Sequence, residues 1–206
     1  MVRKTEMMEN IHILTLPGSD RIDATETALL ARSVFDWERF YGINAVKMGL
    51  TTVNPYEVDA PGSGYIMSQK HTGMHLSHFL MWRHFWHDHD DKQFTVVEDD
   101  VRFTDTWDHP DNWNGIPDDW DMVMLGSCCT EGRPKTHIAG KVYRVEYPLC
   151  THAYMVRRKA LPILLETQDK SWAPIDLALY FNSYPKLNVY TILPRIAYQE
   201  GMDLPV

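Results

Sequence analysis

The sequence has little of three things that would define its class at once: cysteine, positive charge and long apolar runs. Its cysteines, Cys128, Cys129 and Cys150, are odd in number and lack the spacing of a disulfide framework, which predicts free thiols and a reducing, cytoplasmic location. There is no run of about 18 apolar residues, so we expect no membrane span. The charged residues 1–10 lack the apolar stretch of a secretory signal.

A glycine-rich phosphate loop is also missing, as are internal repeats and low-complexity segments. The net charge of −8 argues against nucleic acid as a partner, because a phosphate backbone favours a basic face. A substrate that carries phosphate would need local cations or a metal ion to offset this charge. The 206 residues, 44% of them hydrophobic, can form one globular domain, residues 1–206, with a full core.

What is present is an alternation of short apolar stretches with helical periodicity, which predicts an α/β fold. We expect strands at 11–16, 43–46, 94–97, 120–126, 142–147, 153–156 and 187–193. We expect helices from Asp23 or Thr25 to about 40, from 72 to about 87, at 158–167 and from 174 onward. Residues 50–70 and 127–141 have the turn residues of loops.

Three acids, Glu98, Asp99 and Asp100, follow the 94–97 strand without a spacer. Adjacent carboxylates repel one another unless a cation or hydrogen bonds offset their charge. In an extended segment Glu98 and Asp100 point to the same side and Asp99 to the other. Such a pair of oxygen ligands suits Mg²⁺ or Mn²⁺. The alternative is a solvated acidic turn, but the carboxyl end of a strand is where open α/β sheets bind ligands.

Cations and histidines lie near this stretch in the expected fold. Arg21, in the turn after the first strand, can supply a cation to a nucleotide bound there. His71, His75 and His78 recur at spacings that can share one helix face, which suits either metal binding or, more often, polar surface and packing. Residues 87–91, His-Asp-His-Asp-Asp, have the composition of a ligand cluster, but their place at a helix end favours a solvated turn.

Taken in order, these pieces resemble glycosyltransferase family 25, the lipooligosaccharide and collagen galactosyltransferase group. The matching segments are ILTLPGSDR (13–21), GMHLSHFLMW (73–82), VVEDDV (96–101), WDMVMLG (120–126), AYMV (153–156), APID (173–176) and LNVYTILPRIAYQ (187–199). Together they extend over nearly the whole chain. Two positions depart from the family: His75 stands where cysteine is usual, and the 127–141 loop is compact.

The resemblance implies a GT-A-type fold, a nucleotide-binding mixed sheet flanked by helices. It also implies an inverting transfer of a sugar, commonly galactose, from a UDP-sugar to a hydroxyl of a glycan or glycoprotein acceptor. By the same resemblance Mn²⁺ or Mg²⁺ is held by Glu98, Asp99 and Asp100, and Asp176 is near the acceptor. The donor side is implied to be formed by Leu16, Pro17, Arg21, Ser77 and His78.

Inversion needs a base that takes the proton of the acceptor hydroxyl, and Asp176 is our candidate, with His78 as a second residue of the reaction. Asp176 lies in the first turn of an expected helix, which favours its ionised form, although a simple capping role explains the same position. Two other functions stay open. One is a non-catalytic sugar-nucleotide or glycan-binding domain, and the other is a metal-dependent phosphodiesterase that uses the histidines.

Overall fold

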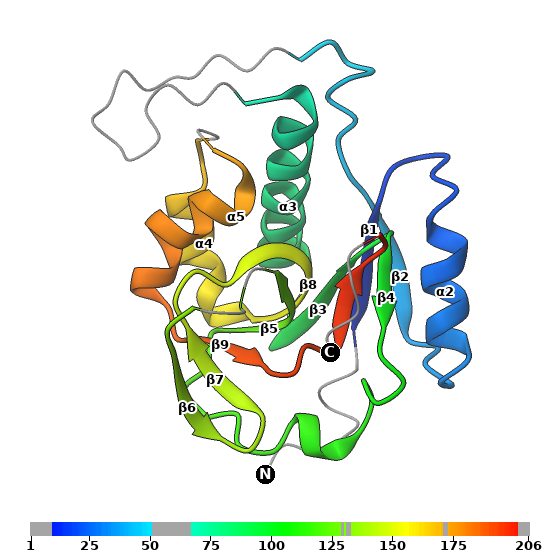
Figure 1. The fold of residues 1–206 in the computed structure, drawn as a ribbon. Coiled ribbons are helices and arrows are strands. Elements are labelled where there is room, and N and C mark those ends of the chain that lie inside the picture. The colour runs from blue at the N-terminus through cyan, green and yellow to red at the C-terminus, as the bar shows by residue number, and fades with distance from the viewer. Residues whose placement is uncertain (1–9, 51–66, 129, 131–132, 171–172, 202–206) are drawn as a thin grey trace.

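The computed structural model describes residues 10–50, 67–128, 130, 133–170 and 173–201. In this part the chain forms an eight-stranded mixed sheet flanked by helices, together with a separate two-stranded sheet (Figure 1). The strands of the large sheet, in spatial order, are β2 (Trp37–Tyr41), β1 (Ile11–Thr15), β3 (Gln93–Glu98), β8 (Leu149–Arg157), β5 (Met122–Cys128), β9 (Val189–Ile192), β7 (Val142–Val145) and β6 (Lys135–Ala139). The small sheet pairs β4 (Val101–Phe103) with β10 (Ala197–Gln199). This architecture confirms the α/β mixed sheet flanked by helices.

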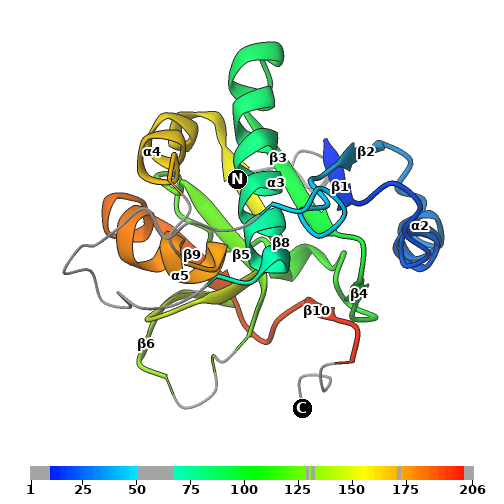
Figure 2. The ribbon, with the colours of Figure 1, turned by 90° about the horizontal axis from the view of Figure 1, so that it is seen from above.

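The helices follow the expected order. They are α2 (Ile22–Leu30), α3 (Gln69–Asp88), α4 (Leu161–Thr167) and α5 (Ile175–Ala178), with the 3-10 turns η1 (Pro110–Asn112), η2 (Arg158–Ala160) and η4 (Tyr184–Lys186) and the π-helical segment η3 (Leu179–Ser183). Seen from above, β1 and β2 lie between α3 and α2 (Figure 2).

Both faces of the central strands are buried because apolar side chains occupy alternate positions on each side of the sheet. Met122 and Met124 of β5 pack with Trp82 and Phe85 of α3 and with α4 and α5. Val123 and its neighbour Leu125 instead pack with Leu29 of α2 and with the tryptophans of the 104–120 segment. This burial on both sides fixes the strand register, since a shift by one residue would exchange the two faces.

Strand directions bring several strand ends to one edge of the sheet. β1 and β3 are parallel, with Leu14 opposite Glu98. β8 runs antiparallel between β3 and β5, with Ala153 opposite Val97. The carboxyl ends of β1, β3 and β5 therefore meet the amino end of β8. All the acids predicted to bind metal lie at this edge.

Helix α3 begins one residue after Ser68, whose hydroxyl accepts a hydrogen bond from the backbone N–H of His71. The expected cap, Thr72, lies inside the helix. At the other end the Arg158 guanidinium donates to the carbonyls of Phe85, Trp86 and His89. It thus satisfies carbonyls that a helix end leaves without partners, and its charge suits the negative end of the helix dipole.

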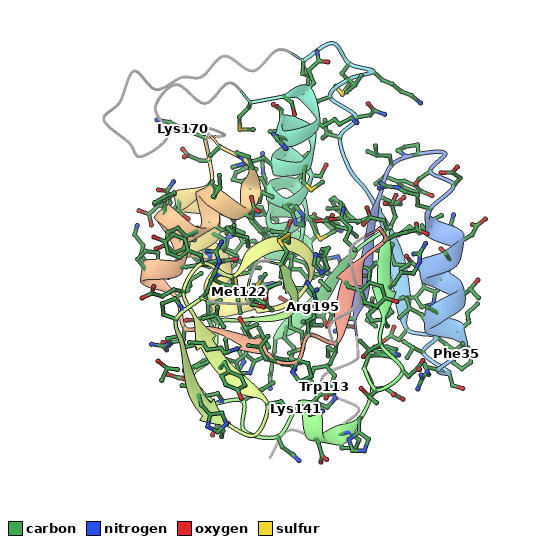
Figure 3. All side chains as sticks on the ribbon, in the orientation of Figure 1. Phe35, Trp113, Met122, Lys141, Lys170 and Arg195 are labelled. Atoms are coloured by element: carbon green, nitrogen blue, oxygen red, sulfur yellow. A yellow bond between two sulfur atoms is a disulfide. The ribbon has the colours of Figure 1, made fainter. Side chains whose placement is uncertain are left out.

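Three expectations about local structure are wrong. The second strand is β2, not 43–46, and helix α2 ends at Leu30 instead of about residue 40. Ser33 has a φ of +58°, and Phe35, which falls within the expected helix, is 73% exposed (Figure 3). The segment 127–141, expected to be a loop, contains strand β6. Of the expected 50–70 loop, residues 51–66 lie outside the described part.

The expectation of free thiols is also wrong for two cysteines, because Cys128 and Cys150 form a disulfide across the ends of β5 and β8. Their Cα atoms lie 5.7 Å apart, within the range that a disulfide can bridge. Cys129 lies outside the described residues. Among the described helices, none is both long and apolar enough to cross a bilayer.

Candidate functional site

The three acids lie at the end of β3, where the strand stops at Glu98 and a turn carries Asp99 and Asp100 into β4. Glu98, Asp99 and Asp100 are only 8%, 2% and 6% exposed. Buried carboxylates are costly unless they are paired or hydrogen-bonded. The solvated-turn alternative therefore does not describe these residues, and each needs partners from the rest of the fold.

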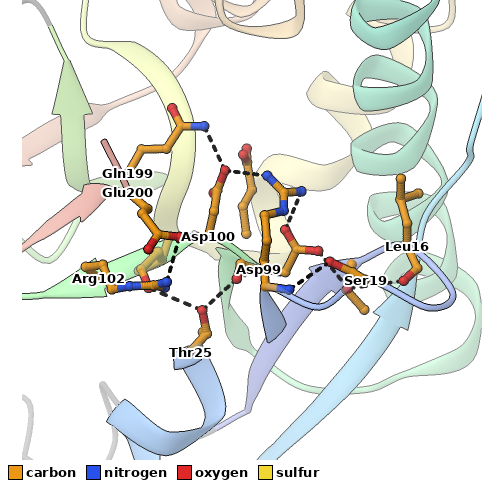
Figure 4. Close-up of polar contacts among 12 residues, drawn as sticks. Leu16, Ser19, Thr25, Asp99, Asp100, Arg102, Gln199 and Glu200 are labelled. Carbon is orange, nitrogen blue, oxygen red and sulfur yellow. Dashed lines mark hydrogen bonds and ion pairs between the residues drawn. The ribbon is translucent and has the colours of Figure 1, made fainter. Parts of the chain in front are cut away.

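Arg21 supplies the main partner for two of the acids. Its Nη2 lies 2.7 Å from Asp99 Oδ1 and its Nη1 lies 2.7 Å from Asp100 Oδ2 (Figure 4). The Thr15 hydroxyl donates to Asp99 Oδ2 at 2.8 Å, and Gln199 Nε2 donates to Asp100 Oδ2 at 2.9 Å. Asp99 and Asp100 thus converge on one guanidinium.

Glu98 turns to a different set of partners. Its Oε1 accepts a hydrogen bond from Thr151 Oγ1 at 2.9 Å and lies 3.4 Å from His78 Nε2. The expectation that Glu98 and Asp100 share one side, with Asp99 on the other, is therefore wrong. The cause is that the strand ends at Glu98, so the alternation of an extended chain does not continue through the next two residues.

His78 is fully buried behind Glu98 and belongs to a chain of hydrogen bonds. Trp82 Nε1 donates to the Tyr154 hydroxyl at 3.0 Å, and that hydroxyl lies 2.9 Å from His78 Nδ1. An indole N–H can only donate, so the Tyr154 hydroxyl accepts from Trp82 and can donate its own proton to His78 Nδ1. Nδ1 is then the acceptor of this ring, and the proton of His78 is assigned to Nε2, which faces Glu98. His78 thus contacts Glu98 and does not line the pocket described below.

The protein environment shifts the pKa values of Glu98 and Asp100 in opposite directions. Burial alone would raise the pKa of Glu98, but His78, the nearby His152 and the Thr151 hydroxyl together hold it below its usual value. The pKa of Asp100 is raised, first by burial and then by the charges of Glu98 and Asp99, against the opposing effects of Gln199 and Arg21. The fold therefore compensates the charge of Asp100 less than that of Glu98.

A divalent metal ion fits these acids if it completes its shell with substrate oxygens. Among the described residues no group of three His, Cys, Asp or Glu side chains is arranged to hold a metal by itself. Asp100 Oδ1 is buried and has no hydrogen-bond partner in the described chain, whereas both oxygens of Asp99 have partners. Mg²⁺ and related ions are usually bound by one or two carboxylates together with phosphates and water, so Asp100 fits as the first ligand.

A pocket of about 560 Å³ opens beside Glu98 and Asp99. Its wall is formed by the end of β1, by residues 42–47 and by the first turns of α3, and it includes Leu16, Arg21 and Ser77. Pro17 lies exposed beyond Leu16. A pocket of this size suits a small-molecule ligand, and its place at the carboxyl ends of parallel strands is where α/β sheets bind nucleotides.

Ser77 fixes the shape of this pocket. Its Oγ accepts a hydrogen bond from the Ile43 N–H at 2.8 Å and donates to the Gly73 carbonyl at 2.6 Å. A Cβ on Gly42 would lie 2.5 Å from this Oγ, and one on Gly73 would lie 2.6 Å from the Ile43 carbonyl oxygen. The two glycines are therefore required by the close approach of the 42–47 segment to α3.

Asp176 lies on the other side of the acid cluster. Its Oδ2 accepts a hydrogen bond from the Cys150 N–H at 3.1 Å and its Oδ1 accepts one from the Leu177 N–H at 2.9 Å. Cys150 has a φ of +69° and is followed by Thr151, the residue that binds Glu98. The amino end of β8 therefore connects Asp176 to Glu98, while Arg21 lies with Asp99 and Asp100.

His75 and His78 of α3 serve packing instead of forming one metal face. His75 is buried, its Nε2 lies 3.1 Å from the Gln168 carbonyl oxygen, and burial lowers its pKa. His78 is committed to Glu98 and Tyr154. The packing alternative is thus the one that the contacts of His75 and His78 support.

Sequence reasoning missed Thr15, Thr151 and Tyr154 as partners of the site. These residues lie far from the acids in the sequence, and threonine and tyrosine are common in strands, so nothing in the pattern marks them. His152 leaves a clearer sign in the structure, since a Cβ on Gly126 would overlap its ring. Gly126, the last residue of the expected 120–126 strand, has no side chain and so leaves room for the His152 ring.

No family model matches the chain, and no curated protein sequence matches it. Two solved structures are similar over most of its length. One is the crystal structure of A197 from STIV, with a TM-score of 0.51, 13% identity and coverage of 95% of this chain and 86% of that one. The other is a glycosyltransferase involved in the glycosylation of the major capsid of PBCV-1, with a TM-score of 0.53, 9% identity and coverage of 95% of each chain. At these identities the likeness concerns the fold. The chain shares the fold of these two structures.

Proposed function

We propose that this protein is a metal-dependent inverting glycosyltransferase of the family 25 kind. It would move galactose or another hexose from a UDP-sugar to a hydroxyl of a glycan or glycoprotein acceptor. The observation that carries the proposal is the set of buried carboxylates at the sheet edge, beside a pocket of about 560 Å³, in a glycosyltransferase-like fold. Asp100 keeps a raised pKa and a buried oxygen without a hydrogen-bond partner in the described chain, and a bound ligand explains why such a carboxylate is held there.

The donor is assigned to the pocket beside the acids. Leu16, Ala45 and Met74 offer apolar surface to a nucleoside, while Lys47 and Lys70 bring positive charge into a chain that is acidic overall. Arg21 is half exposed at this edge and can pair with phosphate oxygens. These cations and the acids would place the diphosphate between the pocket and Asp100.

Mn²⁺ or Mg²⁺ would be held by Asp100. Asp99 would become a second ligand when Arg21 leaves it to bind the phosphates. Glu98 would lie behind these two acids, where His78 and Thr151 position it. When bound, such an ion stabilises the negative charge that grows on the leaving diphosphate. The residues of the chain orient the donor and exclude water from the buried acids, and His78 and Thr151 favour the ionised form of Glu98.

Asp176 is the proposed base. It contacts Cys150, and the next residue, Thr151, contacts Glu98, whereas Arg21 contacts Asp99 and Asp100. Inversion requires a base opposite the leaving group, and we assign that position to Asp176. Its carboxylate accepts two hydrogen bonds from backbone N–H groups, which hold it in place. The same two bonds are also what a structural residue would make, and they favour the non-catalytic sugar-nucleotide-binding domain as a second function.

The phosphodiesterase alternative loses its support, because His75 and His78 are engaged in packing contacts.

Calorimetric titration with UDP tests the proposal. We expect saturable binding in Mn²⁺ that is lost in EDTA and in Asp100→Ala. The matched control is Asp105→Ala, which removes an exposed acid near Arg32, and it should bind UDP like the wild type. Unchanged UDP affinity in EDTA would refute the metal-dependent site. Binding without sugar transfer or hydrolysis across UDP-hexoses and acceptors would favour the non-catalytic domain.

A further inference from the structure

Two histidine rings converge at the carboxyl end of α3, the end remote from the donor pocket. His84 Nε2 and His89 Nε2 lie 3.0 Å apart, with ring centroids separated by 4.7 Å and planes inclined at 80°. The sequence pattern places His89 in a solvated turn, but the chain after the helix folds His89 back onto His84. This pair has no part in the proposed transferase reaction.

Each ring has a carboxylate on its other nitrogen. His84 Nδ1 lies 2.7 Å from Asp88 Oδ2, and His89 Nδ1 lies 3.6 Å from Asp91 Oδ2. The Asp88 hydrogen bond favours the His84 tautomer that carries its proton on Nδ1, and the charge of Asp91, across its longer distance, favours the same tautomer of His89. In that form the Nε2 lone pair of each ring is free. Two lone pairs that face each other at 3.0 Å repel unless a proton or a cation lies between them. Histidines that bind metals commonly have this arrangement, with a carboxylate behind each ring.

The ring geometry accommodates a shared ion as well as the bent N–H···N hydrogen bond that the two rings can form without one. A straight N–H···N bond would align the rings end to end and separate their centroids by clearly more than the observed 4.7 Å. Metal–imidazole bonds of about 2.1 Å and the observed separation of the nitrogens give an angle near 90° at the ion. That is the angle between neighbouring ligands of square-planar or octahedral Cu²⁺ and Ni²⁺, whereas tetrahedral Zn²⁺ would need the rings to open slightly.

The surroundings hold these rings in place. His89 lies 4.5 Å, centroid to centroid, from the buried Phe85 ring, and its carbonyl accepts a hydrogen bond from Arg158. The neighbouring His12 stays neutral near pH 7, because burial and the two other histidines lower its pKa to about 3. The site is also reachable, since the side chains of His84 and His89 are 40% and 27% exposed.

We propose that His84 and His89 bind one divalent transition-metal ion, Cu²⁺ or Ni²⁺ in preference to Zn²⁺, with water in the other coordination positions. Asp88 and Asp91 orient the rings from behind. Imidazole nitrogen and a 90° angle distinguish this site from the oxygen ligands at Asp100, which suit Mn²⁺ or Mg²⁺. The site joins the last turn of α3 to the segment that leads into β3, so an ion there also ties the helix end to the sheet.

Titration of tag-free protein with Cu²⁺ and with Ni²⁺ tests the proposal. We expect one saturable site in the wild type and its loss in His84→Ala and in His89→Ala. His87→Ala is the matched control, because His87 is exposed on the same turn of the helix, and it should retain the site. Asp88→Asn should weaken binding by roughly 10- to 100-fold, the usual effect of removing such an orienting carboxylate.

Electron paramagnetic resonance of the Cu²⁺ protein provides a second readout. We expect the splitting from two imidazole nitrogens in the wild type and in Asp100→Asn, which separates this site from the acids. Thermal melts in EDTA check that the exposed His84→Ala variant folds. Absence of a saturable site in the wild type, or uptake in His84→Ala equal to that of the wild type, would overturn the proposal.

Discussion

Arg21 reaches Asp100 across 79 residues of sequence, with its Nη1 2.7 Å from Asp100 Oδ2, and its second terminal nitrogen holds Asp99 at the same distance. The guanidinium is thus a built-in counter-ion for a pair of buried acids. A metal ion and a diphosphate would compete for both sides of this contact, the ion for the carboxylates and the phosphates for the guanidinium. This competition makes several results predictable.

The first prediction concerns Arg21→Ala. In EDTA the variant should be less stable than the wild type by roughly 1–2 kcal/mol, or about 2–8 °C in melting temperature, because two buried carboxylates lose their cation while Arg21 itself is half exposed. Added Mn²⁺ should restore more stability to the variant than it adds to the wild type, although UDP affinity should fall. Thermal melts with and without Mn²⁺ measure this.

The control for that experiment is Arg39→Ala, which breaks the Glu26 pair on the surface near β2. Such pairs contribute about 0–1 kcal/mol, and their loss should not depend on Mn²⁺. An Arg21→Ala protein that melts like the wild type in EDTA would show that Arg21 does not act as the counter-ion.

The second prediction uses the opposite pKa shifts of Glu98 and Asp100. Because the folded pKa of Glu98 is lowered, its charge stabilises the fold above the unfolded value of about 4.5, and that contribution is lost as the pH falls through the folded pKa. Glu98→Gln should therefore be less stable than the wild type at pH 7, with the difference vanishing in acid. The folded pKa of Asp100 is raised, so its negative charge destabilises the fold at pH 7. Asp100→Asn should therefore be more stable than the wild type at pH 7 in EDTA.

Thermal melts from pH 7 to pH 3.5 in EDTA compare the three proteins. Mn²⁺ should stabilise the wild type and leave Asp100→Asn unchanged. If Asp100→Asn melts below the wild type at pH 7, the carboxylate is better compensated than its contacts indicate.

Much of the fold could be predicted from the sequence. β1, β3, β5 and α3 have strong apolar patterns, since both faces of the central strands and one face of the helix are buried. β2 and β6 could not be found in this way. They are edge strands whose side chains are mostly exposed. Their sequences therefore lack the apolar pattern that marks a buried strand.

The site could be predicted by position but not by orientation. The three acids stand out in sequence, and the sheet brings them to the edge that the strand order implies. Their partners Arg21, Thr151 and Gln199 are 53 or more residues away from the acids that they contact, so only the fold brings them together. The Cys128–Cys150 disulfide was missed for the same reason, because pairing of cysteines depends on the register of two strands.

The third prediction separates His78 from His87. His78→Ala should cost about 2–4 kcal/mol of stability, because it opens a cavity and removes one buried partner from Tyr154 and one from Glu98. Turnover should fall as well, because Glu98 loses one of the contacts that hold it in position. His87→Ala removes an exposed side chain and should leave both quantities near wild type. Denaturant unfolding and transfer assays on both variants measure this, and equal losses in the two would contradict it.

The last prediction concerns Asp176→Asn, which distinguishes the base from a structural residue. The amide oxygen can keep one of the two backbone hydrogen bonds, but the amide nitrogen would then face an N–H donor of Cys150 or Leu177. A purely structural role therefore predicts a loss of about 1 kcal/mol in stability and a transfer rate close to that of the wild type. A base predicts the same small loss of stability together with a fall in transfer of roughly 10²–10⁴-fold at unchanged UDP affinity.

The pH–rate profile adds a readout that a structural role would not change. If Asp176 takes the proton of the acceptor, the wild-type rate should fall in acid as the carboxylate becomes protonated, and the variant should lack this limb. The matched comparison is Cys150→Ser under reducing conditions. This variant lacks the disulfide but keeps the backbone N–H that donates a hydrogen bond to Asp176. If that variant keeps the acidic limb and Asp176→Asn loses it, the effect belongs to the carboxylate and not to the geometry of β8. An Asp176→Asn protein that transfers sugar at the wild-type rate would assign Asp176 to the support of β8 and leave the metal site unaffected.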